Sequence, residues 1–201
     1  MSKPLRQLLA APDEAWAHSQ ITAFAGTDTL TWAQFCSRVG AWEQGFAGVE
    51  HPLVALYLED SIEFAAALFA LWRQGKKALI PANNLPANCR QLRELTSCFA
   101  GDFPGMEVLQ AGLATTLVAL PATVVPASSA TALVLFTSGS TSEPVPVSKT
   151  FAQIETELNA LEAQWGSRLA GANIASTVSP HHIYGLLFRL RSEERRVGQE
   201  R

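Results

Sequence analysis

The chain has 201 residues, of which 48% are hydrophobic and 16% are charged, and its formal net charge is −3. A sequence this rich in apolar residues can bury a sizeable core, which excludes an intrinsically disordered chain. The slight negative charge, with no basic stripe along the sequence, argues against nucleic acid as the main partner.

No segment has the features of a membrane anchor or a secretory leader. No run reaches the ~18 apolar residues that cross a bilayer, and the N-terminal segment lacks the apolar centre and cleavage site of a signal peptide. The three cysteines, Cys36, Cys89 and Cys98, have no metal-site spacing and are expected to be buried free thiols. We therefore expect a cytoplasmic protein with no membrane span and no metal ligands.

Two short strands are predicted near the N-terminus, at residues 21–24 and 29–31, followed by a helix over residues 32–46. Thr31 has a side chain suited to capping that helix. The apolar positions of the helix recur at three- and four-residue steps and predict one buried face: Trp32, Phe35, Val39, Trp42 and Phe46.

The clearest fold signal is the alternation of strands and helices that follows. A strand at residues 53–58 is apolar on both faces, as a central parallel strand requires. The next helix has Ser61 as its expected N-cap and ends at Gly75. A second strand, 76–81, and a second helix, 86–99, repeat the unit. Helices that cross between parallel strands predict an α/β fold with a mainly parallel sheet.

The pattern is weaker in the middle of the chain. Short strands are expected at residues 107–109 and 116–120, and residues 121–129 form a linker rich in Pro, Ala and Ser. The later predicted elements are a strand at 132–136, a helix at 150–165, a strand at 173–178 and an apolar helix that ends near Leu190.

A polar loop follows the strand that ends at Phe136. Its residues are Thr137, Ser138, Gly139, Ser140, Thr141, Ser142, Glu143 and Pro144, and Lys149 comes shortly after. Small side chains let backbone N–H groups approach an anion, hydroxyl groups add donors, and a lysine supplies positive charge. The loop is therefore a candidate site for a polyphosphate.

Motif spacing excludes several other interpretations of this loop. An ordinary Ser/Thr-rich connection between a strand and a helix stays open as the alternative. The sequence has no G-x-x-x-x-G-K-S/T, which excludes a P-loop, and no G-x-S-x-G, which excludes a nucleophile elbow. The absence of G-x-G-x-x-G also disfavours a dinucleotide-binding oxidoreductase.

The order of residues in the loop resembles the phosphate-binding signature of adenylate-forming enzymes, the acyl-CoA and aryl-CoA synthetase superfamily. That signature is aromatic-Thr-Ser-Gly-Ser/Thr-Thr-Gly-x-Pro with a lysine nearby, and residues 136–141, Glu143 and Pro144 match it. Ser142 departs from it, because it stands where the family has a glycine, at a position that can require a positive φ. Lys149 also comes later than usual, in a spacing that resembles the branch found with aryl-polyene and xanthomonadin-type pigment pathways.

Further segments support the resemblance, which covers roughly residues 30–190. In the segment 179–185, His182 stands three residues before Gly185, as in a later motif of the family. Taken alone, this spacing also fits a histidine that caps a helix. The resemblance implies that His182 and Gly185 line the pocket for the carboxylate substrate. Residues 31–35 and 53–81 resemble the family's early segments.

The resemblance implies an ATP-dependent carboxylate ligase. An acid is activated as an acyl-adenylate with ATP and Mg²⁺, and the acyl group then passes to coenzyme A or to the thiol of an acyl carrier protein. The phosphate-binding residues would be Thr137, Ser138, Gly139, Ser140, Thr141 and Lys149. No catalytic residue is expected within the chain, because the family's downstream motifs do not follow Gly185.

The resemblance also divides the chain into two parts. Residues 1–190 are expected to be the N-terminal part of an AMP-binding adenylation domain, too incomplete to be active alone. Residues 191–201 carry four of the fifteen basic residues and resemble a translated sequencing-adaptor string, so we expect them to lie outside the native fold. The alternative function is a non-catalytic nucleotide-binding module or scaffold remnant.

Overall fold

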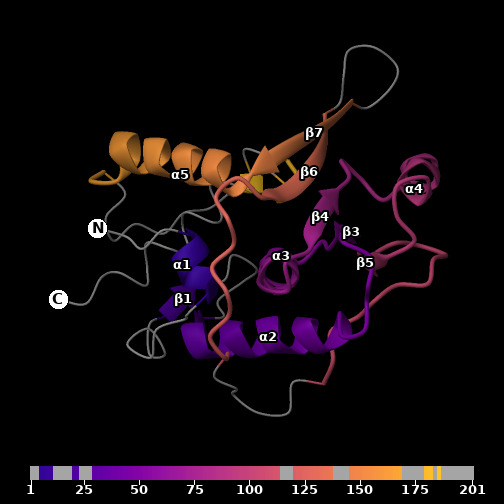
Figure 1. The fold of residues 1–201 in the computed structure, drawn as a ribbon, viewed down its shortest axis with the longest axis horizontal. Coiled ribbons are helices and arrows are strands. Elements are labelled where there is room, and N and C mark those ends of the chain that lie inside the picture. The colour runs from indigo at the N-terminus through magenta and orange to yellow at the C-terminus, as the bar shows by residue number, and fades with distance from the viewer. Residues whose placement is uncertain are drawn as a thin grey trace.

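The fold is described from a computed structural model, which covers residues 5–10, 20–22, 29–113, 120–137, 145–168, 179–182 and 185–186. A five-stranded sheet in the order β5-β3-β4-β6-β7 forms its centre (Figure 1). These strands are β3 (Leu53–Tyr57), β4 (Lys77–Ile80), β5 (Phe99–Gly101), β6 (Thr131–Thr137) and β7 (Val145–Thr150). Neighbours are parallel except for the β6–β7 hairpin, which confirms the predicted α/β fold with a mainly parallel sheet.

The remaining elements are five helices and a small two-stranded sheet, counted over the described residues. The small sheet pairs β1 (Gln20–Thr22) with β2 (Thr29–Thr31) in antiparallel fashion. The helices are α1 (Leu5–Ala10), α2 (Trp32–Gly45), α3 (Ser61–Arg73), α4 (Pro86–Arg93) and α5 (Phe151–Trp165). Within the described part of the chain, no helix combines the length and the apolar character needed to cross a membrane.

Polar residues at the helix starts explain where the long helices begin. Thr31 caps α2 and Thr150 caps α5, each through a capping box with a glutamine three residues later, Gln34 and Gln153. The predicted role of Thr31 is confirmed. The predicted cap of α3 is wrong: Ser61 is the first helical residue, and the carboxylate of Asp60 accepts the hydrogen bonds from the first turn instead.

The strands divide their side chains between two faces of the sheet, as their period of two requires. On one face, which we call the large-core face, Val54 and Leu56 of β3 join a cluster that includes side chains from α1, α2, α3 and α5. On the other, the α4 face, Ala55 and Leu79 pack with Cys89 and neighbours. Figure 1 shows α3 between α2 and the sheet, with α4 on the opposite side.

Two arginines hold the N-terminal helix and the linker against the large-core face. Arg73 at the end of α3 donates to Glu43 at 2.7 Å, to the carbonyl of Leu9, and to the carbonyl of Pro121 at 2.8 Å. Arg6 of α1 forms an ion pair with a glutamate of α5 and donates to a linker carbonyl. The predicted linker, residues 121–129, contains no helix or strand and is fixed by these contacts.

Several predicted elements differ from the structure. The helix predicted over 86–99 ends at Arg93, and Phe99 instead begins the short strand β5, which pairs with β3. The strand predicted at 107–109 is reduced to one bridge between Leu109 and Ala100. Strand β7 was not predicted. The predictions for residues 116–119, 173–178 and 191–201 lie outside the described residues.

Candidate functional site

The carboxyl edge of the parallel strands is where the sheet opens toward a possible ligand. From β3 the chain turns into α3 on the large-core face, whereas from the adjacent β4 it turns into α4 on the other face. Where neighbouring strands connect to opposite faces, their carboxyl ends leave a crevice, and ligands of open α/β sheets bind there. Tyr57, Ile80 and Thr137 end three strands at this edge.

The β6–β7 hairpin brings the Ser/Thr loop to the same edge. Its register pairs Thr137 with Val145, so both ends of the connection 138–144 start from one point beside the end of β4. Of the predicted phosphate-binding residues, Thr137 is the last residue of β6, while Ser138, Gly139, Ser140 and Thr141 lie outside the described residues. The hairpin thus fixes where the loop begins and ends.

Lys149 lies further from the loop than its place in the motif suggests. The register pairs it with Leu133, four residues along β7 from Val145, which corresponds to about 13 Å at roughly 3.3 Å per residue. Its ammonium group forms an ion pair with Glu157 of α5. The structure therefore gives Lys149 an acidic partner at the base of the hairpin, and Val145 occupies the strand position next to the loop.

A histidine that the sequence did not single out is buried at the crevice. The ring of His181 stacks on Tyr57 with centroids 3.9 Å apart and meets the Phe64 ring edge-on at 5.1 Å. The side chain is 4% exposed. Its Nδ1 lies 2.7 Å from the hydroxyl of Ser179, and its Nε2 accepts from the backbone N–H of Leu58 at 3.4 Å.

The predicted pocket residues, His182 and Gly185, follow this buried histidine in the chain. The side chain of His182 is exposed. Its backbone N–H donates to the carbonyl of Ser179 at 3.2 Å, and its backbone carbonyl accepts from the N–H of Leu186 at 2.9 Å. Gly185 is buried. His181 and His182 are the same residue type in adjacent positions, so the sequence could not tell which one is buried. The only local signal is Ser179, a hydroxyl two residues before His181.

Tyr57 shares this edge with acidic groups. Burial raises the pKa of its phenol above the ordinary value, and Glu59 and Asp102 raise it further because they are negatively charged. Asp102 is held in place because its carboxylate accepts from the backbone N–H of Glu59 at 2.9 Å. Tyr57 therefore stays protonated at neutral pH and presents an uncharged ring to His181.

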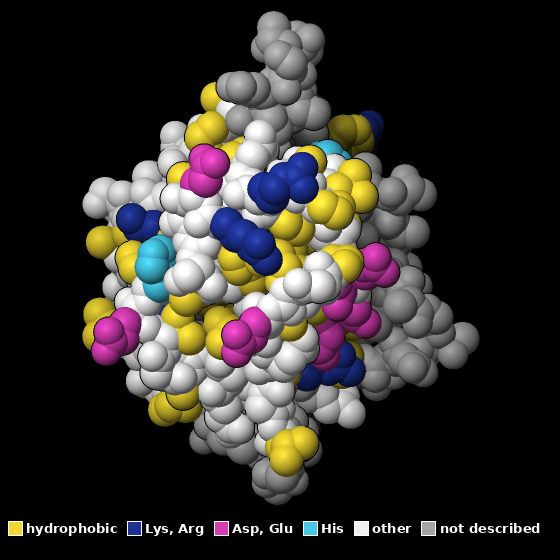
Figure 2. Space-filling view, turned by 90° about the vertical axis from the view of Figure 1, so that its right-hand side faces the viewer, with side chains coloured by type: hydrophobic (Ala, Val, Ile, Leu, Met, Phe, Trp, Pro, Cys, Tyr) yellow, Lys and Arg dark blue, Asp and Glu magenta, His cyan; other side chains and the backbone are white. Residues whose placement is uncertain are grey.

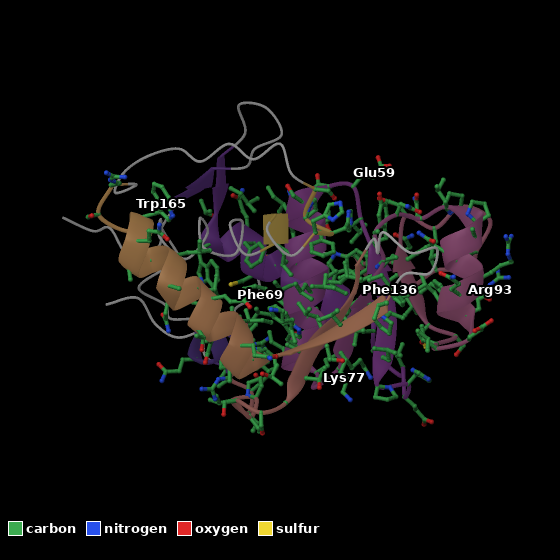
Figure 3. All side chains as sticks on the ribbon, turned by 90° about the horizontal axis from the view of Figure 1, so that it is seen from above. Glu59, Phe69, Lys77, Arg93, Phe136 and Trp165 are labelled. Atoms are coloured by element: carbon green, nitrogen blue, oxygen red, sulfur yellow. The ribbon has the colours of Figure 1, made fainter. Side chains whose placement is uncertain are left out.

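A small cavity lies on the α4 face beside the start of the loop. It has a volume of ≈ 180 Å³ and is lined by Pro81, Ala82, Asn83, Asn88, Gln91, Leu92 and Phe136. Figure 3 shows Phe136 on the side of the sheet toward α4, with Arg93 on the outer side of that helix. Figure 2 shows this face of the molecule, where basic and apolar side chains lie close together. The described residues contain no group of three or more His, Cys, Asp or Glu side chains that could hold a metal ion.

Solved structures with a similar fold include CoA ligases. A malonyl-CoA ligase in a ternary product complex with methylmalonyl-CoA and AMP is 22% identical, with a TM-score of 0.70 over 98% of this chain and 43% of that one. Apo MatB from Rhodopseudomonas palustris is 18% identical, with a TM-score of 0.75 over 98% and 44%. The fold is that of part of an adenylate-forming domain.

A third structure extends the comparison to another acid. The o-succinylbenzoate CoA synthetase MenE from Bacillus subtilis, in complex with its acyl-adenylate intermediate, is 18% identical, with a TM-score of 0.72 over 96% of this chain and 43% of that one. These matches cover 96–98% of this chain, which itself spans less than half the length of the three matched proteins. It matches no protein-family model and no curated protein.

Proposed function

We propose that residues 1–190 are the N-terminal part of an ATP-dependent carboxylate ligase, an acyl-CoA synthetase-like enzyme. The observation that carries the proposal is the Ser/Thr/Gly loop, whose two ends start from the carboxyl edge of a sheet with the adenylate-forming fold. One MatB structure with this fold has ATP bound, and one MenE structure has ATP and a magnesium ion. In this proposal the loop takes the triphosphate of ATP, and residues 191–201 take no part.

The chain's own contribution to the reaction is to hold ATP while a carboxylate oxygen attacks the α-phosphate. The loop residues donate backbone N–H and hydroxyl hydrogen bonds to the β- and γ-phosphates: Thr137, Ser138, Gly139, Ser140 and Thr141. Such fixed donors stabilise the charge that develops as pyrophosphate leaves. Mg²⁺ would be held by the triphosphate and would supply further positive charge there, since the described residues contain no group of three or more His, Cys, Asp or Glu side chains to bind it.

The second half-reaction transfers the acyl group to the thiol of coenzyme A or of an acyl carrier protein. His182 and Gly185 belong, in this proposal, to the wall of the carboxylate pocket, and the exposed side chain of His182 is accessible for that role. The spacing from Pro144 to Lys149 favours the branch of the superfamily found with aryl-polyene and xanthomonadin-type pigment pathways. The chain would work in the cytoplasm.

Lys149 has two possible roles, and its ion pair with Glu157 provides a way to separate them. If Lys149 neutralises phosphate charge, Lys149→Ala lowers the adenylation rate about 10²-fold or more, as the loss of one such contact does, whereas Glu157→Gln leaves the rate unchanged or raises it. If Lys149 only joins β7 to α5, both substitutions have the same small effect. A steady-state adenylation assay of the full-length protein distinguishes these results.

The proposed function is tested by acid-dependent ATP–pyrophosphate exchange with a panel of aryl and fatty acids. The full-length protein is expected to catalyse exchange with at least one acid, while residues 1–201 alone are expected to be inactive. Binding of ATP without exchange by the full-length protein would support the non-catalytic alternative. Restoring glycine at the signature position, Ser142→Gly, is expected to change ATP affinity only modestly. A rise from no activity to a normal rate would identify the protein as an inactivated homologue.

A further inference from the structure

The buried ring of His181 connects three parts of the fold. It lies against Tyr57 at the end of β3, against Phe64 in α3, and within the segment that carries His182 and Gly185. The ring therefore fills the point where the chain leaves β3 for α3, at one side of the crevice described above. None of the roles proposed so far uses this side chain.

The hydrogen bonds of the ring determine which nitrogen carries the proton. Because Nε2 accepts from the Leu58 N–H, the proton lies on Nδ1, which donates to the hydroxyl of Ser179 at 2.7 Å. The same hydroxyl accepts from the backbone N–H of His181 at 3.3 Å. The ring thus accepts the hydrogen bond of the Leu58 N–H, just past the end of β3, and connects this residue to Ser179 through its other nitrogen.

We propose that His181 is the positioning residue that fixes residues 179–182 to the end of β3. It would thereby set the place of His182, and of Gly185 beyond it, in the carboxylate pocket. The inference rests on the proposed function for the identity of that pocket. It separates the two neighbouring histidines. His181 acts through the backbone it holds, and the exposed His182 is the one that can meet a substrate.

The contact itself can be tested in the 201-residue chain by amide hydrogen exchange. His181→Phe keeps an aromatic ring against Tyr57 and Phe64 and removes the hydrogen bonds of the ring to Leu58 and Ser179. We expect exchange of the Leu58 amide to become at least about fivefold faster, as the loss of one hydrogen bond of ~1 kcal/mol predicts, with the core amide of Leu56 unchanged. The matched control, His182→Phe, should leave both amides as in the unsubstituted chain.

Two results would overturn the contact. One is an unchanged Leu58 amide in His181→Phe, and the other is an equal effect from His182→Phe. Should His181→Phe fail to fold, the imidazole ¹⁵N shifts of the unsubstituted chain still decide, because the inference requires a proton on Nδ1 and none on Nε2. A proton on Nε2 contradicts it.

The consequence for the site is tested in the full-length protein. His181→Phe should raise the KM for the acid about fivefold and leave the KM for ATP within about twofold, since a general loss of structure would affect both substrates. His181→Gln, which can still accept from Leu58, should recover part of the loss. Equal changes in both KM values, or none, would overturn the positioning role. If the unsubstituted full-length protein catalysed no ATP–pyrophosphate exchange, the proposed function would be overturned. The amide hydrogen exchange result for His181 would still stand.

Discussion

The two faces of the sheet differ in how completely they are covered. Among the described residues, four helices contribute side chains to the core on the large-core face, which buries bulky side chains such as Trp42, Trp72 and Phe35. In the same part of the chain, the α4 face is covered by one helix of 8 residues, and several of its apolar side chains, including Tyr57, Val134 and Phe136, are only half-buried. The first face stabilises the fold, while the second keeps surface beside the loop and the cavity that a ligand or further chain can reach.

The largest expected difference between the faces comes from truncating one aromatic residue on each. Trp72 is fully buried, donates from Nε1 to the carbonyl of Ala132 at 2.8 Å and contacts the ring of Phe151. Trp72→Ala should lower the free energy of unfolding by about 4 kcal/mol, and Phe136→Ala by only ~1 kcal/mol because that ring is half-buried. Urea unfolding measures both, and equal losses would remove the distinction between the faces.

A buried arginine should cost nearly as much. Arg73→Met keeps most of the apolar stem but leaves Glu43 and two backbone carbonyls without their donor. We expect a loss of about 3 kcal/mol, with protease cleavage near α1 becoming faster. The control is the exposed Arg93 of α4, whose replacement by Ala should change the free energy of unfolding by less than about 0.5 kcal/mol. A loss near zero for Arg73→Met would show that these contacts are dispensable.

The α4 face is not uniformly tolerant, and Gly101 of β5 provides the test. Its φ is +95°, and an added Cβ would lie 2.2 Å from the carbonyl oxygen of Tyr57. Gly101→Ala should therefore cost about 2 kcal/mol in the free energy of unfolding. Gly48 also has a positive φ but open space around it, so Gly48→Ala should cost about 1 kcal/mol. A thermal unfolding series ranks the two, and the opposite order would contradict this account.

The alkylation rates of two cysteines with similar exposure provide the finest comparison of the two faces. Cys36 on the large-core face is 5% exposed, and Cys89 on the α4 face is 7% exposed. Burial raises the pKa of the Cys36 thiol to about 12, with Arg73 opposing the shift. At pH 8 we expect alkylation of Cys36 to be at least about tenfold slower than that of Cys89, because the thiolate is the reactive form and the thinner face opens more readily. Mass spectrometry of timed alkylation checks the order.

The Cys36 thiol should also make the free energy of unfolding depend on pH. The folded pKa of Cys36 is above its ordinary value of 9.0, so the folded chain keeps a proton that the unfolded chain releases. The free energy of unfolding should therefore fall as the pH rises from about 9 toward 12. In Cys36→Ala that part of the decline should disappear, and an identical decline would assign it to other groups.

The elements that the sequence predicted well are those in which local and tertiary signals agree. Helices α2 and α5 start after threonine caps and carry an apolar repeat, and β3 and β4 are short apolar runs that follow Pro52 and Gly75-Lys76. The sequence failed where a distant partner decides. Phe99 continues a helical pattern, but pairing with β3 extends it into β5. Strand β7 was not predicted because Pro146 argues against a strand. A proline is tolerated there because β7 is an edge strand of the sheet.

The candidate site shows the same limit. The loop residues could be proposed from their order alone, since small and hydroxylated side chains after a buried strand are a local property, and their role stays a prediction. The partner of Lys149 could not, because Glu157 approaches it only when α5 packs beside β7. Nor could the burial of His181, which depends on Tyr57 and Phe64, residues more than a hundred positions earlier in the chain.

The β6–β7 hairpin also limits what folding requires of the residues that it connects. The ends of the connection 138–144 are paired by the hairpin itself, and the closure entropy of a loop rises by only about 0.6 kcal/mol for each doubling of its length. The sheet would therefore form with many other connections of similar length. Selection for folding therefore places almost no demand on the identity of these residues, which leaves their serine, threonine and glycine side chains free to serve the proposed phosphate-binding role.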